Sequence, residues 1–200
     1  MSTGTGTGQF ELTYTGGVHG YAGRMATHMW AGIVDGFDPV ELRYPVESLH
    51  DDTHYAAEVV GQGIPTMIFR GNAFRGRPRL ADMDLHTDGW NAKVKRRSLA
   101  VSPYGRALRI EVAGRSYRYM AGAGRLRREL RREGASVTMT RSEWHRPRRI
   151  TGTWQGRADG MDIGLAILLE AAYSRNLTFL GALYSWPGRF LSRFLQLPLG

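Results

Sequence analysis

The first half of the chain contains two groups of histidine and acidic residues whose spacing suits metal binding or acid–base chemistry. In the first group, His50, His54 and Glu58 follow one another at intervals of four residues. If residues 47–60 form a helix, the three side chains share one face, and two histidines at i,i+4 can reach one divalent ion. The alternative is a solvent-exposed polar face of the same helix.

The second group is Asp82, Asp84, His86 and Asp88, which occupy every second position of a segment with strand-like alternation. Alternate side chains of a strand point the same way, so these four line one face. Carboxylates beside an imidazole suit a divalent cation or a base with a tuned pKa. His54, His86 and Asp84 are therefore the catalytic candidates, and both groups together are the metal candidates. The alternative is the solvated face of an amphipathic strand.

The composition narrows the chemistry and the class of protein. The absence of cysteine excludes disulfides, thiolate zinc sites and a cysteine nucleophile. No run approaches the roughly 18 apolar residues of a membrane span, so a soluble, cytoplasmic protein is expected. Two hundred residues suit one domain. We predict a flexible tail at 1–8 and a single domain at 9–200, made of an acidic part (9–90), a basic β-rich part (91–177) and an amphipathic tail (178–200).

The net charge of +9 is unevenly distributed along the chain. Residues 1–90 carry 6 basic and 11 acidic side chains, whereas residues 91–200 carry 21 and 7. Such polarity is typical of proteins with an anionic partner, here an anionic lipid surface or an acidic protein. Nucleic acid is disfavoured, because the basic run at 125–132 lacks aromatic residues for base stacking. The alternative is that 25 arginines against 2 lysines reflect codon usage, with solvated strand faces.

The hydrophobic pattern predicts an α+β fold that is mainly antiparallel β. Apolar residues alternate in many short segments, and the turn at Ala113-Gly114 marks a hairpin. A helix-like spacing appears at 24–37, a second helix is predicted at 47–60, and 71–78 is predicted as a loop. The predicted strands are 9–14, 66–69, 80–87, 93–101, 108–112, 116–120, 125–133, 136–140 and 150–157. For 125–133 the spacing of Leu126 and Leu130 also fits a helix, and a strand is favoured because its neighbours are strands.

The segment 163–173 is predicted to be a helix with Asp162 as its N-cap. Glu170 is its one charged residue, so it is apolar on every side, which is typical of a helix buried all round. Eleven residues span about 16 Å, too short for a bilayer core of about 30 Å. It either lies inside a barrel or packs between one sheet and a further layer. Glu170 is expected at the mouth of the sheet or beside an arginine.

This order of elements resembles the tubby-like β-barrel, a fold also seen in the plant LURP-one family and in phospholipid scramblases. The resemblance covers residues 91–177: successive basic hairpins, a strand at 150–157, a short acidic link at 159–162, and the apolar helix. It implies a closed antiparallel sheet around that helix, and binding of anionic lipid headgroups through basic residues. The candidates it implies are Arg127, Arg128, Arg131, Arg132, Arg146, Arg148 and Arg149.

The C-terminal segment 187–196 is amphipathic, with Phe190 and Phe194 on the face opposite Arg189 and Arg193. It suits peripheral contact with an anionic membrane or packing against a partner subunit, and the alternative is that it folds back on its own domain. The leading hypothesis is thus a non-catalytic module that binds an anionic partner, with a membrane surface or anionic lipid as the preferred one. The alternatives are a small metal-dependent or pocket-type enzyme of a biosynthetic pathway, and a structural or assembly subunit that forms homo-oligomers.

Overall fold

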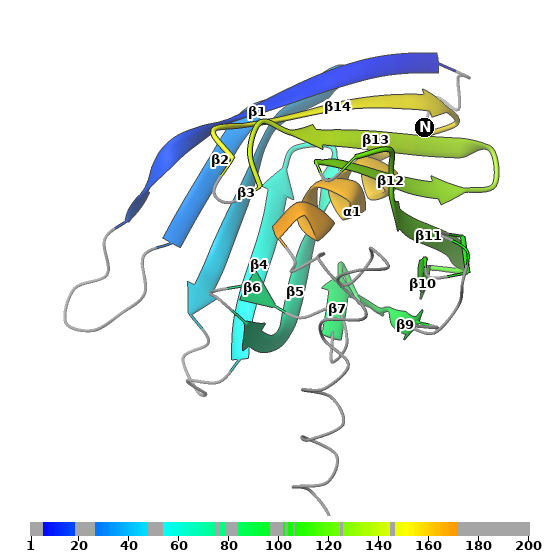
Figure 1. The fold of residues 1–200 in the computed structure, drawn as a ribbon, viewed down its shortest axis with the longest axis horizontal. Helices are drawn as coiled ribbons and strands as arrows, with labels where there is room; N and C mark the ends of the chain where they lie inside the picture. The colour runs from blue at the N-terminus through cyan, green and yellow to red at the C-terminus, as the bar shows by residue number, and fades with distance from the viewer. Residues whose placement is uncertain are drawn as a thin grey trace, which may run out of the picture.

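The structure is a computed structural model, and its described part forms a nearly closed antiparallel β-barrel around one helix (Figure 1). The described residues are 6–18, 27–47, 54–74, 77–78, 84–96, 102, 104–105, 107–124, 126–144 and 147–171. The elements are β1 (Gly6–Val18), β2 (Thr27–Val34), β3 (Phe37–Glu47), β4 (His54–Gly61), β5 (Ile64–Phe74), β6 (Arg77–Pro78), β7 (Asp84–Thr87), β8 (Trp90–Asn91), β9 (Lys93–Arg96), β10 (Leu108–Val112), β11 (Arg115–Ala121), β12 (Arg127–Arg132), β13 (Ala135–Arg141), β14 (Arg149–Gly156) and α1 (Gly160–Ala171).

The sheet is an up-and-down meander that returns to its starting point. Its strand order is β8-β7-β5-β4-β3-β2-β1-β14-β13-β12-β11-β10-β9, and β6 lies off this path against β5. The two end strands, β8 and β9, are separated in sequence by Ala92 alone. The Ala92 N–H donates to the Leu85 carbonyl at 2.9 Å. The chain therefore passes from one end of the sheet to the other at Ala92.

The first and last strands, β1 and β14, join the two halves of the barrel through aromatic–glycine pairs. Phe10 lies opposite Gly152, and Trp154 lies opposite Gly8. A Cβ atom at Gly152 would be 2.1 Å from the Phe10 ring, and one at Gly8 would be 2.4 Å from Trp154. Each glycine thus leaves the space that an aromatic ring of the neighbouring strand fills.

Alternation along the strands separates the core from the outer face. In β10, Leu108, Ile110 and Val112 are buried, whereas Glu111 between them is exposed. The hairpin that joins β10 to β11 has positive φ angles at Ala113 (50°) and Gly114 (73°), as its tight turn requires. The hairpin prediction is confirmed, as are the strand assignments at 125–133 and 136–140.

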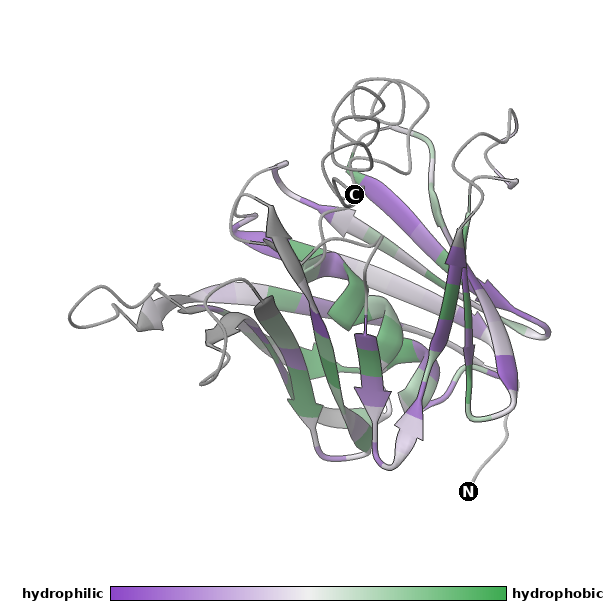
Figure 2. Ribbon diagram, turned by 90° about the horizontal axis from the view of Figure 1, so that it is seen from below, coloured by the Kyte–Doolittle hydropathy of each residue, from purple (hydrophilic) through white to green (hydrophobic). Residues whose placement is uncertain are grey.

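The predicted apolar helix is α1, and it lies inside the barrel with eleven of its twelve residues buried (Figure 2). Its N-terminus differs from the prediction, because α1 begins at Gly160 and Asp159 is the cap. The Asp159 Oδ1 accepts hydrogen bonds from the backbone N–H groups of Met161 at 3.1 Å and Asp162 at 3.3 Å. The Asp162 Oδ2 accepts in return from the Asp159 N–H at 2.9 Å, which completes a capping box.

The helix predicted at 47–60 is wrong, because β4 occupies 54–60, and the helix-like spacing at 24–37 belongs to a strand, because β2 occupies 27–34. Trp30 and Val34 are four residues apart, a spacing that fits one helix face and one strand face equally well. Both side chains are fully buried on the inner face of β2. The segment predicted as a loop at 71–78 contains the end of β5 and all of β6. Strand β1 begins at Gly6, inside the predicted tail.

Candidate anion-binding surface

The predicted metal ligands of the first group do not lie on a helix. His50 lies outside the described residues, and His54 begins β4, where only its backbone is described. Glu58 faces the outside of the barrel, opposite Arg43 of β3. On a strand, four residues span about 13 Å, whereas one helical turn spans about 5.4 Å. His54 and Glu58 therefore lack the spacing on which the helical metal prediction depended.

In the second group, Asp84 and His86 contact each other, and Asp82 lies outside the described residues. The His86 Nε2 is 2.7 Å from Asp84 Oδ2, and its Nδ1 is 2.6 Å from the Asn91 amide oxygen. Both ring nitrogens are thus engaged by oxygen atoms. Asp88 lies in the following turn at a φ of 23°.

The sheet places one member of each predicted metal group, Glu58 and His86, in the same cross-strand row, but too far apart to share an ion. The row runs from Glu58 through Ile68 to His86 on β4, β5 and β7. Two strand spacings separate Glu58 from His86 by about 10 Å, too far for both to hold an ion bound at about 2 Å. Across the described ranges, no group of three or more metal-ligating side chains comes together.

Strand alternation divides the predicted arginine cluster of β12 between the two faces of the barrel. Arg127 and Arg131 point outward, whereas Arg128 and Arg132 point inward. Arg128 is 1% exposed, and its Nη1 donates to the Arg127 carbonyl at 2.7 Å. The two inward arginines are therefore unavailable to an external partner.

Two of the remaining predicted arginines, Arg148 and Arg149, lie near the start of β14. Both side chains are exposed. The Arg149 Nε pairs with the Glu11 carboxylate at 3.0 Å, and the Arg148 Nε lies 4.0 Å from the Glu143 carboxylate. Arg146 lies outside the described residues, as does the amphipathic segment 187–196. Within the described residues, no helix is long and apolar enough to cross a bilayer.

The two carboxylates of α1, one near each end of the helix, form ion pairs with arginines of the barrel, and Asp162 lies 3.7 Å from Arg115 as well as beside Arg132. Asp162 accepts from Arg132 Nε at 2.7 Å and Nη2 at 2.8 Å, and from the Tyr117 hydroxyl at 3.0 Å.

Glu170 pairs with Arg141 and accepts from the Tyr119 hydroxyl at 3.0 Å. The side chains of both Glu170 and Arg141 are almost completely buried. The expectation that Glu170 meets an arginine is confirmed, and Arg141 is the residue that it meets.

Burial and a nearby carboxylate both favour the neutral form of two tyrosines. Burial is the larger cause that raises the pKa of Tyr119, and the Glu170 charge raises it further. Burial and the Asp162 charge likewise raise the pKa of Tyr117 well above 10.0, the ordinary value. Both tyrosines therefore remain protonated donors to the carboxylates of α1.

The stability of the barrel is expected to fall as the pH rises above about 10. The unfolded chain releases the two tyrosine protons there, while the folded chain retains them, so each group reduces the free energy of unfolding by about 1.4 kcal/mol per pH unit. This contribution is fully present below the ordinary tyrosine pKa and is lost above it.

Chemical unfolding of the wild type and of Tyr119→Phe, measured between about pH 9 and 11, checks this expectation. The variant should show the shallower loss of stability. Equal slopes would contradict the role of Tyr119.

The outer face of β9–β12 carries a row of four cations from four successive strands, which we call the cation row. Lys95 lies opposite Arg109, Arg109 opposite Arg118, and Arg118 opposite Arg131. With strands about 4.8 Å apart, the row extends about 14 Å. Like charges directly opposite each other destabilise a sheet. The register thus concentrates positive charge at a cost in stability.

The members of the cation row differ in how far their charge is compensated. Within the described part of the chain, neither Lys95 nor Arg109 makes an ion pair. Arg118 lies under the exposed Tyr104, with its Cζ 3.9 Å from the ring centroid, and its buried Nη1 has no hydrogen-bond partner there. Arg131 pairs with Glu129 at 2.6 Å. The row therefore keeps most of its positive charge available.

The sequence contained part of the signal for the cation row. Arg109 lies between Leu108 and Ile110, and Arg118 lies between Tyr117 and Tyr119, an alternation that places both arginines on the face opposite the apolar side chains. Their direct opposition follows from the turn at Ala113-Gly114. The placement of Arg131 beside Arg118 depends on the longer connection between β11 and β12, whose register no local pattern determines.

The fold and this surface define a class of protein: a nearly closed antiparallel β-barrel with an enclosed apolar helix and a basic outer wall. Compared with protein-family models, curated proteins and solved structures, the chain gives no match.

Proposed function

We propose that this protein is a non-catalytic binding module whose cation row engages an anionic lipid surface. The observation that carries the proposal is the direct opposition of four cations across β9–β12. An overlying layer of anions would relieve the repulsion between them. The tubby-like resemblance supports the same proposal, because it implies binding of anionic headgroups by a barrel that encloses an apolar helix.

The net positive charge on the outer face of β9–β12 suits an anionic lipid surface. The outward side chains of β9–β12 comprise six cations and two anions, namely Lys93, Lys95, Arg109, Arg118, Arg127 and Arg131 against Glu111 and Glu129. Each lysine or arginine near an anionic membrane contributes about 1 kcal/mol of binding free energy. The four members of the cation row would together contribute about 4 kcal/mol by that measure.

A lipid surface also suits this wall better than a single-stranded nucleic acid. Single-strand binders stack successive bases on several aromatic side chains. The large exposed aromatic side chains among the described residues are Trp90 and Tyr104, each at 57% exposure, and of these two Tyr104 contacts a member of the cation row, Arg118.

Co-sedimentation with vesicles tests the proposal. The wild type should bind phosphatidylcholine vesicles that contain phosphatidylserine, and should not bind vesicles of phosphatidylcholine alone. Binding should weaken as salt rises from about 0.01 to 0.15 M, because the screening length falls from about 30 to 8 Å. The double variant Lys95→Gln/Arg109→Gln should lose about 2 kcal/mol of binding free energy, roughly 30-fold in affinity.

The matched control removes two paired cations elsewhere on the outer face. Arg43 pairs with Glu41 and Arg149 with Glu11. Arg43→Gln/Arg149→Gln has the same net charge as the test variant and should bind nearly as the wild type does. The test variant should also be at least as stable as the wild type, because it removes a repulsion. If Lys95→Gln/Arg109→Gln bound the vesicles as tightly as the wild type, the cation row would be ruled out as the contact.

A further inference from the structure

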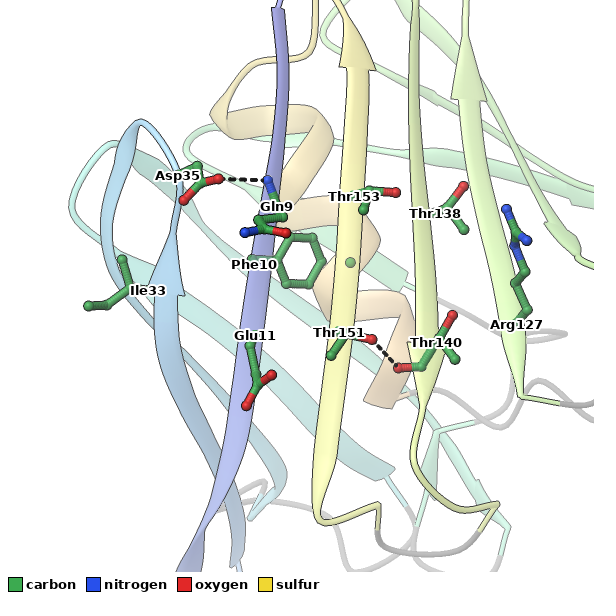
Figure 3. A pocket seen from close by; sticks show the side chains of 11 residues that line it. Gln9, Phe10, Glu11, Ile33, Asp35, Arg127, Thr138, Thr140, Thr151 and Thr153 are labelled. Carbon is green, nitrogen blue, oxygen red and sulfur yellow. Dashed lines mark hydrogen bonds between the residues drawn. The ribbon is translucent and has the colours of Figure 1, made fainter.

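A polar groove lies on the outer face of the barrel, across β2, β1, β14, β13 and β12 (Figure 3). Its volume is about 470 Å³, within the range of small-molecule sites. It is separate from the cation row, which runs along β9–β12. The outline of the groove follows from the lengths of outward side chains on neighbouring strands.

The floor of the groove is a square of four threonines on two strands. Thr138 lies opposite Thr153, and Thr140 lies opposite Thr151. Side chains directly opposite on an antiparallel sheet are about 5 Å apart. The Thr151 hydroxyl donates to the Thr140 carbonyl at 3.4 Å and can still accept from a ligand (Figure 3). A threonine hydroxyl can both donate and accept, so the floor presents four polar groups at the spacing of neighbouring strands. Longer side chains on β1 and β12 flank these short ones, which makes the surface concave.

The walls of the groove carry charges of both signs that are already oriented. On one side, Asp35 Oδ2 accepts from the Gln9 backbone N–H at 2.9 Å, and Glu11 pairs with Arg149 at 3.0 Å. On the other side, Arg127 extends from β12 opposite Thr140. Two carboxylates on one wall disfavour an anion, and the guanidinium on the other disfavours a cation. The groove therefore suits a neutral ligand with many hydroxyl groups.

The rim of the groove adds an apolar contact. Ile33 lies opposite Glu11 and is 69% exposed, the most exposed large apolar side chain in the described part of the chain. A pyranose ring has hydroxyls at its edge and a C–H face that can rest on such a side chain. An open-chain polyol has C–H groups but no rigid ring face, so it would cover Ile33 less completely.

From these features we infer that the groove binds a neutral saccharide of one or two pyranose rings. The threonine hydroxyls of β13 and β14 contact the sugar hydroxyls, the carboxylates of Glu11 and Asp35 accept from them, and Ile33 covers one ring face. This activity goes beyond the proposed lipid contact and uses different residues, although both sites include outward side chains of β12. Kd values in the millimolar range are expected, because the floor is open to water.

Amide chemical shifts in ¹H–¹⁵N correlation spectra test this inference with maltose, cellobiose and lactose as probes. At least one disaccharide should shift amides confined to 9–11, 33–35, 138–140 and 151–153, whereas sorbitol and glucose 6-phosphate should not. Thr138→Val/Thr151→Val removes two floor hydroxyls with little change in shape and should weaken binding about tenfold or more.

The control variant is Thr13→Val, an exposed strand threonine of β1 outside the groove, which should bind as the wild type does. The spectrum of each variant without sugar shows whether the barrel is intact. The inference is overturned if no disaccharide shifts these amides at about 100 mM, where a site with a Kd of about 10 mM is roughly nine-tenths occupied. It is also overturned if the floor variant binds as tightly as the wild type. Neither result depends on vesicle binding, which uses the cation row.

Discussion

Replacement of Glu170 by alanine is expected to reduce the free energy of unfolding by about 3–5 kcal/mol. The carboxylate is buried against Arg141 and the Tyr119 hydroxyl at the C-terminal end of α1. Its removal leaves the Arg141 guanidinium charged in the interior without its counter-ion, and a domain of this size has only about 5–15 kcal/mol of total stability. Urea unfolding followed by tryptophan fluorescence measures the loss.

Two further variants separate the buried pair from an ordinary surface pair. Glu11 pairs with Arg149 at 3.0 Å on the outer face, where both side chains are about half exposed, so Glu11→Ala should cost less than about 1 kcal/mol. The double replacement Glu170→Leu/Arg141→Met should recover most of the stability lost in Glu170→Ala, because apolar side chains of similar volume often substitute for a buried pair. A loss below about 1 kcal/mol in Glu170→Ala would contradict the enclosed position of α1.

Gly160→Ala is expected to destabilise the barrel by about 3 kcal/mol or more. A Cβ atom at Gly160 would lie 2.1 Å from the Gly63 carbonyl oxygen, in the turn between β4 and β5. A backbone oxygen in a tight turn cannot move aside as a side chain can, so the start of α1 or the turn itself must shift. The position thus requires glycine for close approach of helix and sheet.

Gly164→Ala, in the same helix, is the matched comparison. Its Cβ would lie 2.5 Å from Ile64 Cγ2 and 3.1 Å from Met67 Cε, which are both side-chain atoms. Repacking costs about 1–3 kcal/mol, and the gain in helix propensity from glycine to alanine offsets about 1 kcal/mol of it. Thermal unfolding should therefore rank Gly160→Ala as clearly less stable than Gly164→Ala. The reverse ranking would show that α1 does not dock on the β4–β5 turn.

The strands and the apolar helix α1 could be predicted wherever the hydrophobic pattern fitted only one kind of element. Leu108, Ile110 and Val112 alternate with charged residues, which fits a strand and no helix. Segment 163–173 is apolar on every side, which requires a buried helix. The helix prediction for 47–60 was wrong because a spacing of four residues fits the period of a helix and also that of a strand. The structure forms strand β4 there because the segment pairs with β3 and β5.

The amino-acid sequence by itself determined the basic character of the second half, the alternating strands and the need to enclose an apolar helix. These are local properties, set by side-chain type and by the period of each segment. The tertiary structure alone decided which arginines face outward together. Arg128, Arg132 and Arg141 point inward, two of them to the carboxylates of α1, whereas Arg109 and Arg118 meet across strands. A shift of one residue in strand register would reverse both faces, and register is set by contacts between strands, which no single segment contains.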